Sequence, residues 1–480
     1  MISLFILGII LRLFMVLSQK SFWFDEWASI ETSSLPFKEM LIFHLHDSHP
    51  PLYYSLLHFL IRCFGIQEGI LRLPSLVAGV LALFGIYWLA REVFGRRRAL
   101  LSLALAAVSP YLIYMSHEIR NHGWPIAFCA FGSTFFMRWN RSKHPKWYYA
   151  FVAASFLAVY SSYFSWFWLL PHILFSKNFF KKRFIFISLL APSAFLFLYH
   201  GSKHEMLLRF FSFHSWATKV LQDTTSLFWN LCCGSAFFMH PAYFHKWLAL
   251  LAFYAHTSKL FWLSVPAFLT SIFLLVRGAV WAIRNSRIFS RVSLVPFLAM
   301  FIVSLSNPNR LDARYFGFLS PFYFLLLAAG VFSLKRRVLK MIFFSVIILN
   351  SFLSDVVIIR LNTSPMWRED HAGMTKFVFQ NAGPRDAILG LSPLGRYYVD
   401  KFHLRTQGTL LESLEDVDNV KQNNFEKIWV LEGAFSGSEE WISLNRIMKA
   451  VHYEPSGKEI SFGADESFAL VNVFKKSASN

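Results

Sequence analysis

Carboxylate side chains gather in one stretch of an otherwise apolar and basic sequence. Within residues 22–54, Asp25 and Glu26 stand side by side, and Asp47 follows later in the same stretch. Carboxylates beside a membrane are costly to desolvate, so their presence there indicates a function. A carboxylate can act as a general base and remove the proton of an attacking hydroxyl group. We therefore predict a catalytic site in this stretch, and a solvated acidic loop is the alternative.

Further charged side chains stand next to apolar segments elsewhere in the chain. Glu118 and Arg120 follow one such segment, and Arg310 and Arg314 precede another. An arginine at such a place can simply anchor the interface, with its charged end in water. Guanidinium groups also bind phosphate through two parallel hydrogen bonds. Together with a carboxylate base, they predict the transfer of a sugar from a lipid phosphate, which leaves as a stable anion while the hydroxyl attacks.

The composition indicates the class of protein that carries these residues. Of the 480 residues, 55% are hydrophobic, 18% are aromatic and only 16% are charged, which is typical of a polytopic membrane protein. In a soluble protein, the net charge of +19 would suggest a nucleic-acid partner. Here the Lys and Arg residues stand in short runs between apolar segments. The positive-inside rule explains such runs, so we expect membrane lipids and no nucleic acid as partners.

Apolar runs predict about eleven transmembrane helices. The predicted spans are Ile2–Ser18, Leu73–Phe94, Ala99–Met115, Trp124–Trp139, Trp147–Tyr160, Phe164–Phe175, Phe184–Tyr199, Leu260–Val276, Val292–Leu305, Tyr315–Ser333 and Val338–Val357. One further run, Leu52–Phe64, has thirteen residues, or about 20 Å of helix, against a hydrocarbon core of about 30 Å. If this run lies in the interface and the amino terminus is cytoplasmic, every strong basic cluster falls on the cytoplasmic side.

This topology divides the chain into two domains. Residues 1–360 would form the transmembrane domain, with residues 21–72 as its first outer loop. Residues 361–480 would form a small α/β domain on the outer face. Its expected strands are Ala387–Leu391, Ile428–Leu431 and Phe468–Phe474, and its expected helices are 365–380 and 439–450. The catalytic loops and the carboxy terminus would thus lie on the extracytoplasmic side of the plasma (inner) membrane.

Several short motifs resemble those of one known family. In chain order they are Phe24-Asp25-Glu26, Asp47-Ser48-His49-Pro50-Pro51-Leu52-Tyr53-Tyr54, Leu71-Arg72-Leu73-Pro74-Ser75, Phe94-Gly95-Arg96-Arg97, Glu118-Ile119-Arg120-Asn121, Arg314-Tyr315-Phe316 and Pro365-Met366-Trp367-Arg368-Glu369. Together they resemble the bacterial branch of the protein O-mannosyltransferase-like group of GT-C glycosyltransferases. The aminoarabinose transferase that acts on lipid A belongs to the same broader group. The strongest part of the resemblance is residues 24–110.

The resemblance implies an inverting glycosyltransferase with a polyprenyl-phosphate sugar as donor. The acceptor hydroxyl could belong to a lipid, a glycan or a protein. The family's acidic loop residue corresponds to Asp25, which is the leading candidate for the base, with Glu26 beside it and Asp47 as a further catalytic residue. Some relatives carry lysine where this chain has His49. The residues expected to bind substrate are His49, Tyr53, Glu118, Arg120, Arg310, Arg314 and Tyr315.

Two further roles are open for the carboxylates. No cofactor is firmly expected, although some GT-C enzymes use a divalent cation, which Asp25, Asp47 and Glu118 could bind. Alternatively, Asp47 could cap the amino terminus of a helix that begins near Pro50.

Two rival functions use similar residues. A polyprenyl-lipid flippase or transporter would also need basic outer residues and an apolar groove, but transporters place their sites near the middle of the bilayer. A polysaccharide ligase or polymerase would take an oligosaccharide diphosphate as donor. Transfer of labelled sugar to a product distinguishes an enzyme from a flippase.

Overall fold

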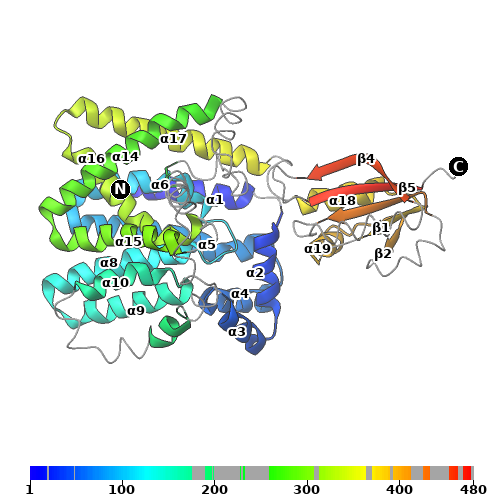
Figure 1. Cartoon of the computed structure of the whole chain (residues 1–480), viewed down its shortest axis with the longest axis horizontal. Helices are drawn as coiled ribbons and strands as arrows, with labels where there is room; N and C mark the ends of the chain where they lie inside the picture. The colour runs from blue at the N-terminus through cyan, green and yellow to red at the C-terminus, as the bar shows by residue number, and fades with distance from the viewer. Residues whose placement is uncertain are drawn as a thin grey trace. The chain divides into compact units, whose positions relative to one another are not determined.

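A computed structural model describes most of the chain (Figure 1). The described residues are 1–18, 21–47, 49–175, 190–196, 198, 228, 231–232, 259–306, 313–363, 370–389, 393–411, 425–432, 453–462 and 469–476. They fall into two units, of which the first comprises residues 1–17 and 29–358, and the second comprises residues 18–28 and 359–480.

The first unit is built from helices. They are α1 (Ile2–Ser18), α2 (Phe24–Ser34), α3 (Phe37–His46), α4 (Pro51–Phe64), α5 (Glu68–Phe94), α6 (Arg96–Ala107), α7 (Pro110–Tyr114), α8 (Gly123–Ser142), α9 (Pro145–Ser161), α10 (Ser165–Leu174), α14 (Lys259–Asn285), α15 (Arg287–Ser306), the 3₁₀ helix η4 (Ala313–Leu319), α16 (Ser320–Ser333) and α17 (Arg337–Thr363). The first turn of α2 belongs to the second unit, so this helix is shared by both.

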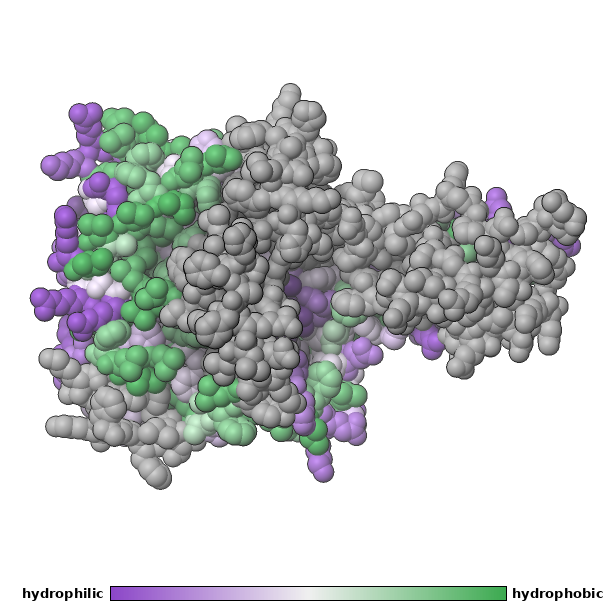
Figure 2. Space-filling model, in the orientation of Figure 1, coloured by the Kyte–Doolittle hydropathy of each residue, from purple (hydrophilic) through white to green (hydrophobic). Residues whose placement is uncertain are grey.

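Four helical stretches among the described residues are long and apolar enough to cross a membrane. They are Glu68–Phe94, Ser264–Asn285, Ala313–Ser333 and Arg337–Val356, and Ile2–Ser18 is a shorter apolar helix. The outer faces of α14 and α17 expose large apolar side chains such as Leu269, Ile283 and Phe352, each about 58–61% exposed. Figure 2 shows a broad hydrophobic area on this unit, with hydrophilic residues along one edge. A multi-pass membrane protein is therefore confirmed, whereas the count of eleven spans stays a prediction.

The bounds of one predicted transmembrane span are wrong. The expected helix Ala99–Met115 is two helices, because α6 ends at Ala107 and α7 begins at Pro110. The residue before a proline is disfavoured in helical conformation, and the Ser109 hydroxyl accepts a hydrogen bond from the Leu112 amide at 3.3 Å, as a cap does. The twelve residues of α6 measure about 18 Å, so α6 is shorter than a membrane span. The predicted span Phe184–Tyr199 lies mostly outside the described residues.

The buried Arg12 donates hydrogen bonds to the last carbonyl groups of α6. Its Nη1 donates hydrogen bonds to the carbonyls of Gly8, at 2.9 Å, and Ala107, at 3.1 Å. Its Nη2 donates to the carbonyl of Ala106 at 3.2 Å. The last carbonyls of a helix lack partners within that helix, so a cation there both satisfies and neutralises them. Arg12 is fully buried, and Asp355 of α17 supplies the attracting negative charge.

The stretch predicted as the first outer loop is more ordered than the sequence predicts. Residues 21–72 contain α2 and α3 in addition to the expected α4, which runs from Pro51 to Phe64. The sequence of α2 contains Ser, Thr and Asp residues, which are weak helix formers. Its first turn carries Asp25 and Glu26, whose negative charges favour a helix amino terminus. Tertiary packing of the buried Ile30 supplies the rest of its stability.

The second unit contains a five-stranded sheet in the order β2-β1-β3-β5-β4. Its strands are β1 (Asp386–Leu389), β2 (Thr409–Leu411), β3 (Lys427–Glu432), β4 (Tyr453–Phe462) and β5 (Ala469–Lys476). β1 pairs in parallel with β2 and β3, and β5 is antiparallel to β3 and β4. The helices α18 (His371–Asn381) and α19 (Pro393–Lys401) complete the described part of this unit.

The sequence predicts three of these five strands. It misses β4 because Pro455 and Gly457 interrupt its pattern; β4 is an edge strand with an irregularity between Pro455 and Glu459, where proline is tolerated. The expected helix at 365–380 begins instead at His371 within the described part, after Asp370, whose carboxylate accepts the Gly373 amide at 2.8 Å. The expected helix at 439–450 lies outside the described residues.

Candidate active site

Asp25 and Glu26 form the first turn of α2. Glu26 is fully buried, whereas Asp25 is only partly buried. Both belong to the segment 18–28, which forms one unit with the carboxy-terminal part of the chain. A partly exposed carboxylate can reach an external hydroxyl group more easily than a buried one, so this burial favours Asp25 over Glu26 as the base.

Asp47 lies between two histidines. Its Oδ2 is 3.1 Å from Nδ1 of His49 and 3.7 Å from Nδ1 of His44. The expected helix cap is wrong, because Asp47 follows the carboxy-terminal end of α3, and the cap position of α4 is Pro50, with no side-chain capping bond. The carboxylate is engaged by the imidazole of His49 and is therefore turned toward the site, not toward the backbone of α4.

His44 is buried and neutral at physiological pH. Burial lowers the pKa of its imidazole to about 4, although the nearby Asp47 carboxylate acts in the opposite direction. Its Nδ1 lies 3.2 Å from the carbonyl of His49, which can only accept, so Nδ1 carries the proton. The ring stacks on Tyr54, with 3.9 Å between centroids. His44 therefore fixes the turn between α3 and α4 on which Asp47 and His49 stand.

Arg120 joins the segment after α7 to α2. Its Nη1 donates a hydrogen bond to the Ser29 hydroxyl at 3.2 Å. The Ser75 hydroxyl on α5 donates to the carbonyl of Glu118 and fixes the backbone of this segment. Burial raises the pKa of the Tyr54 hydroxyl to about 12, while the positive charge of Arg120 opposes that shift. Tyr54 and Ser29 thus line the surroundings of the Arg120 guanidinium.

Glu118 and Arg314 meet across the site. Nη1 of Arg314 lies 4.0 Å from Oε2 of Glu118, whose side chain is 1% exposed. Arg314 belongs to η4, which the Tyr111 hydroxyl holds through a 3.1 Å hydrogen bond to the Ala313 carbonyl. Two segments far apart in the chain, 116–122 and 313–319, are therefore brought together with their charged side chains facing each other.

Aromatic rings fill the space between these groups. Tyr315 stacks on Phe164, with 5.2 Å between centroids, and lies 6.2 Å from the ring of His49 and 5.8 Å from that of His122. Burial lowers the pKa of His122 well below its usual value, and the charges of Arg314 and Arg120 add to that effect. Tyr53 is 2% exposed and packs edge-on against Tyr54. The positive charges of Arg120 and Arg314 therefore both lower the pKa of the same buried histidine.

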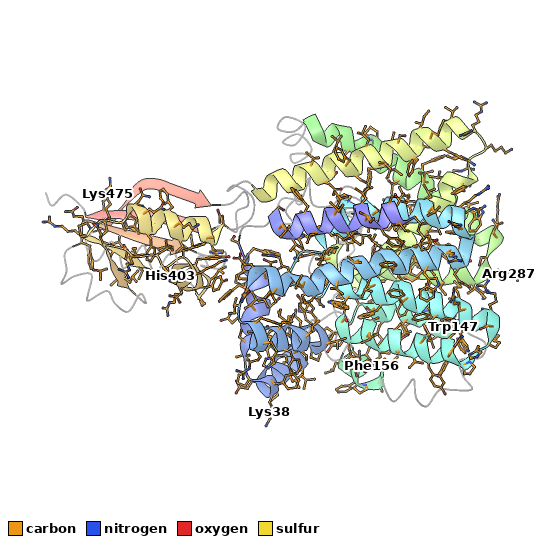
Figure 3. All side chains as sticks on the ribbon, turned by 180° about the vertical axis from the view of Figure 1, so that it is seen from behind. Lys38, Trp147, Phe156, Arg287, His403 and Lys475 are labelled. Atoms are coloured by element: carbon orange, nitrogen blue, oxygen red, sulfur yellow. The ribbon has the colours of Figure 1, made fainter. Side chains whose placement is uncertain are left out.

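Six of the predicted substrate residues and Asp47 lie in the first unit. Asp47, His49, Tyr53, Glu118, Arg120, Arg314 and Tyr315 are linked by the contacts above, and Arg310 lies outside the described residues. In Figure 3, Lys38 of α3 marks one end of this helical unit, and Trp147 and Arg287 lie at the opposite end.

The site also contains five residues that were not predicted from the sequence: Ser29, His44, Tyr54, Ser75 and His122. A signal was present for some of them, because His44 opens the histidine-rich run before His49, and His122 follows the Glu118–Asn121 motif directly. Ser29 carries no such signal. Where the chain is described, no group of three or more His, Cys, Asp or Glu residues is arranged to hold a metal ion.

Comparisons with known proteins agree with this fold. Residues 48–200 match the model of the dolichyl-phosphate-mannose-protein mannosyltransferase family. No curated protein matches the sequence. The crystal structure of ArnT from Cupriavidus metallidurans bound to undecaprenyl phosphate matches with a TM-score of 0.53 at 14% identity, and covers 100% of this chain and 99% of that one. Its apo form matches with a TM-score of 0.55 at 12% identity, with the same coverage. These matches agree with the predicted resemblance: part of the chain is similar to the mannosyltransferase family, and the chain has the fold of ArnT.

Proposed function

We propose that this protein transfers a sugar from a polyprenyl-phosphate donor to an acceptor hydroxyl at the outer face of the membrane. The observation that carries the proposal is that segments 116–122 and 313–319, far apart in sequence, face each other through Arg314 and Glu118, and that Arg120 and Arg314 both act on the pKa of His122. Two guanidinium groups in one region are suited to a phosphate. The family model is named for a dolichyl-phosphate donor, and the similar ArnT structure holds undecaprenyl phosphate.

The donor phosphate would be held by the arginines. Arg120 is oriented by Ser29 and Arg314 by Glu118, so each guanidinium is fixed before the donor binds. Such preorganised charge stabilises the leaving phosphate without a cost of rearrangement during the reaction. His49, held by Asp47, and Tyr315 would contact the donor beside the arginines, and Arg310 remains a predicted partner.

Asp25 would act as the general base. The acceptor oxygen forms a bond to the anomeric carbon, the bond from that carbon to the phosphate oxygen breaks, and the acceptor proton passes to the Asp25 carboxylate. Attack from the side opposite the phosphate inverts the anomeric configuration. The leaving polyprenyl phosphate is already a stable anion and needs charge stabilisation more than a proton. The buried Glu26 would orient the first turn of α2.

The side of the membrane follows from the charge pattern. The turns between α5 and α6, α8 and α9, α14 and α15, and α16 and α17 carry the strong basic clusters, and the positive-inside rule places them in the cytoplasm. The site segments would then face the extracytoplasmic side of the plasma membrane, as would the carboxy-terminal unit. The acceptor would be a lipid, a glycan or a protein that carries a hydroxyl group.

The test compares four carboxylate variants by initial transfer rate, with radiolabelled polyprenyl-phosphate sugar in excess and at matched protein levels. Asp25→Asn should insert and bind donor, yet lose about 10²- to 10⁴-fold in transfer rate, as removal of a general base does. Glu26→Gln and Asp47→Asn should be less damaging. Glu31→Gln, which changes an exposed carboxylate on the same helix, is the matched control and should behave as the native protein.

Two outcomes would contradict the proposal in different ways. If Asp25→Asn keeps more than a tenth of the native rate while Glu26→Gln or Asp47→Asn abolishes transfer, another carboxylate of the loop is the base. If the labelled lipid crosses the bilayer and no sugar reaches a product, the protein is a flippase.

A further inference from the structure

Within the second unit, helix α19 contacts the segment that carries Asp25. Phe22 is fully buried, and its backbone N–H donates a hydrogen bond to the Tyr398 hydroxyl at 2.5 Å. The ring of Tyr397 lies 5.5 Å from that of Phe22 and 5.6 Å from that of Trp27. The contacts from Tyr397 therefore stand on both sides of Asp25 and Glu26 in the sequence.

The two tyrosines are themselves firmly placed. Both stand on α19, and Tyr398 is fully buried and stacks on Phe402, with 5.6 Å between centroids. α19 packs against α18, which contributes Met374 and Val378 to the core under the sheet. A displacement of α19 would disturb this core. The packing of the core therefore also keeps the contacts of α19 with Phe22 in place.

Ser29 stands in the middle of the same helix. Ser29 follows Asp25 by one helical turn and accepts the hydrogen bond from Arg120. The short helix α2 is thus fixed at its first turn by an aromatic contact from α19 and one turn later by the arginine proposed to bind phosphate. A helix transmits such constraints directly, because its hydrogen bonds keep successive turns in register.

We propose that Tyr397 and Tyr398 are positioning residues for catalysis, because they contact the segment that carries Asp25. This inference rests on the proposed role of Asp25. The tyrosines do not touch the reacting atoms; they set the direction of the first turn of α2 and so the place of the Asp25 carboxylate. A base misplaced by about 1 Å can cost about 10²-fold in rate.

The test uses the full-length protein and separates positioning from folding. Tyr398→Phe keeps the ring and removes the hydroxyl that accepts from Phe22, and Tyr397→Leu removes the ring between Phe22 and Trp27. The control is Trp429→Phe, which removes the 2.9 Å hydrogen bond from Trp429 to Asp386 in the sheet of the same unit. For each variant, kcat, the donor KM and the apparent Tm are measured.

If the two tyrosines position the base, their replacement should change kcat but not the donor KM. Tyr398→Phe and Tyr397→Leu should lower kcat by about tenfold or more, because the base is misplaced, and should leave the donor KM within about twofold. Trp429→Phe should lower Tm at least as much and leave kcat unchanged. Exchange of the amide hydrogens in residues 21–27 with deuterium should be faster in the two tyrosine variants only.

The outcomes distinguish this inference from the proposed function. If Asp25→Asn abolishes transfer but both tyrosine variants keep native kcat, the positioning role is wrong and the function stands. A fall of kcat in all three variants in proportion to their loss of Tm would reduce the tyrosines to a structural role. If Asp25→Asn itself remains active, the proposed base is wrong and the positioning of its helix has no catalytic meaning.

Discussion

Nη1 of Arg314 lies 4.0 Å from Oε2 of Glu118, and the Glu118 side chain is only 1% exposed. A buried carboxylate stabilises the structure only while a positive partner stays near it, since an isolated buried charge is very costly. Glu118 therefore holds Arg314 in one orientation, just as Ser29 holds Arg120. Two arginines with fixed directions form a better phosphate site than two mobile ones, because less freedom is lost when the donor binds.

Replacement of either arginine should weaken donor binding. Hydrogen bonds to charged groups contribute about 1.5–3 kcal/mol, so Arg120→Ala and Arg314→Ala should raise the donor KM about 10- to 100-fold. Lysine at either position should restore only part of the affinity, because it offers a point charge in place of a fork. The measurement is the donor KM, with the exposed Arg284→Ala as the control. Native affinity in both alanine variants would show that these arginines only anchor the interface.

His44 should make the stability of the native protein depend on pH. Its pKa is lowered to about 4 in the folded state, so below its ordinary value of about 6.5 the unfolded state binds the proton more readily. Its contribution is complete above pH 6.5 and is lost as the pH falls toward 4, by at most about 3 kcal/mol. His44→Asn keeps an N–H for the His49 carbonyl and should flatten this fall.

The control for His44 stands two residues away. His46 is exposed, and its Nδ1 lies 2.9 Å from the carbonyl of Ile42. Apparent melting temperatures from pH 4 to 7.5 should give parallel curves for the native protein and His46→Asn. If the melting temperature of His44→Asn falls with decreasing pH as steeply as that of the native protein, another group causes the loss of stability between pH 6.5 and pH 4.

Arg12 should be essential for stability and not for the chemistry. Arg12→Ala removes three hydrogen bonds to helix carbonyls and leaves Asp355 without its attracting charge. A hydrogen bond from a charged donor typically contributes about 1.5–3 kcal/mol, and Arg12→Ala removes three. A large fall in the apparent melting temperature is expected, and the double variant with Asp355→Asn should lose less than the sum of the single losses. Additive losses would show that the two side chains are not coupled.

Two glycines set the distance between α14 and α16. A Cβ on Gly278 would lie 2.0 Å from the Leu326 carbonyl oxygen, and one on Gly330 would lie 2.1 Å from the Leu274 carbonyl oxygen. Because both obstacles are backbone, Gly278→Ala or Gly330→Ala must push the helices apart, at a cost of about 1–3 kcal/mol or more. Gly69→Ala on α5 meets nothing within 4 Å and serves as the control. Melting temperatures that match this control would disprove the close crossing.

The sidedness of the loops can be checked with reporter fusions. Fusions after Arg98, Lys143 and Arg336 should report the cytoplasm, and fusions after Asp47, Asn121 and Gly383 should report the outer face, because the basic clusters share one side. Fusions after Lys182 should also report the cytoplasm. A common compartment for Asp47 and Arg98 would mean that α4 spans the membrane, despite its fourteen residues.

The sequence alone was sufficient for the class of protein and for most elements. Long apolar runs such as Glu68–Phe94 and Arg337–Thr363 predict membrane helices because hydrophobicity is a local property that needs no partner. Strands β1, β3 and β5 were recognisable for the same reason. The acidic stretch and the outer arginines were recognisable as a site because charge next to a membrane is too costly to be incidental.

Only the tertiary structure decided which of these residues meet. The sequence does not tell that Asp47 contacts His49 in place of capping α4, that Glu118 orients Arg314, or that Ser29 holds Arg120. It also leaves open that the backbone N–H of Phe22 donates a hydrogen bond to the Tyr398 hydroxyl, across 376 positions of the sequence. Such pairs depend on how helices pack, and packing is determined by the shapes of all side chains together, whereas sequence patterns report only the surroundings of each residue along the chain.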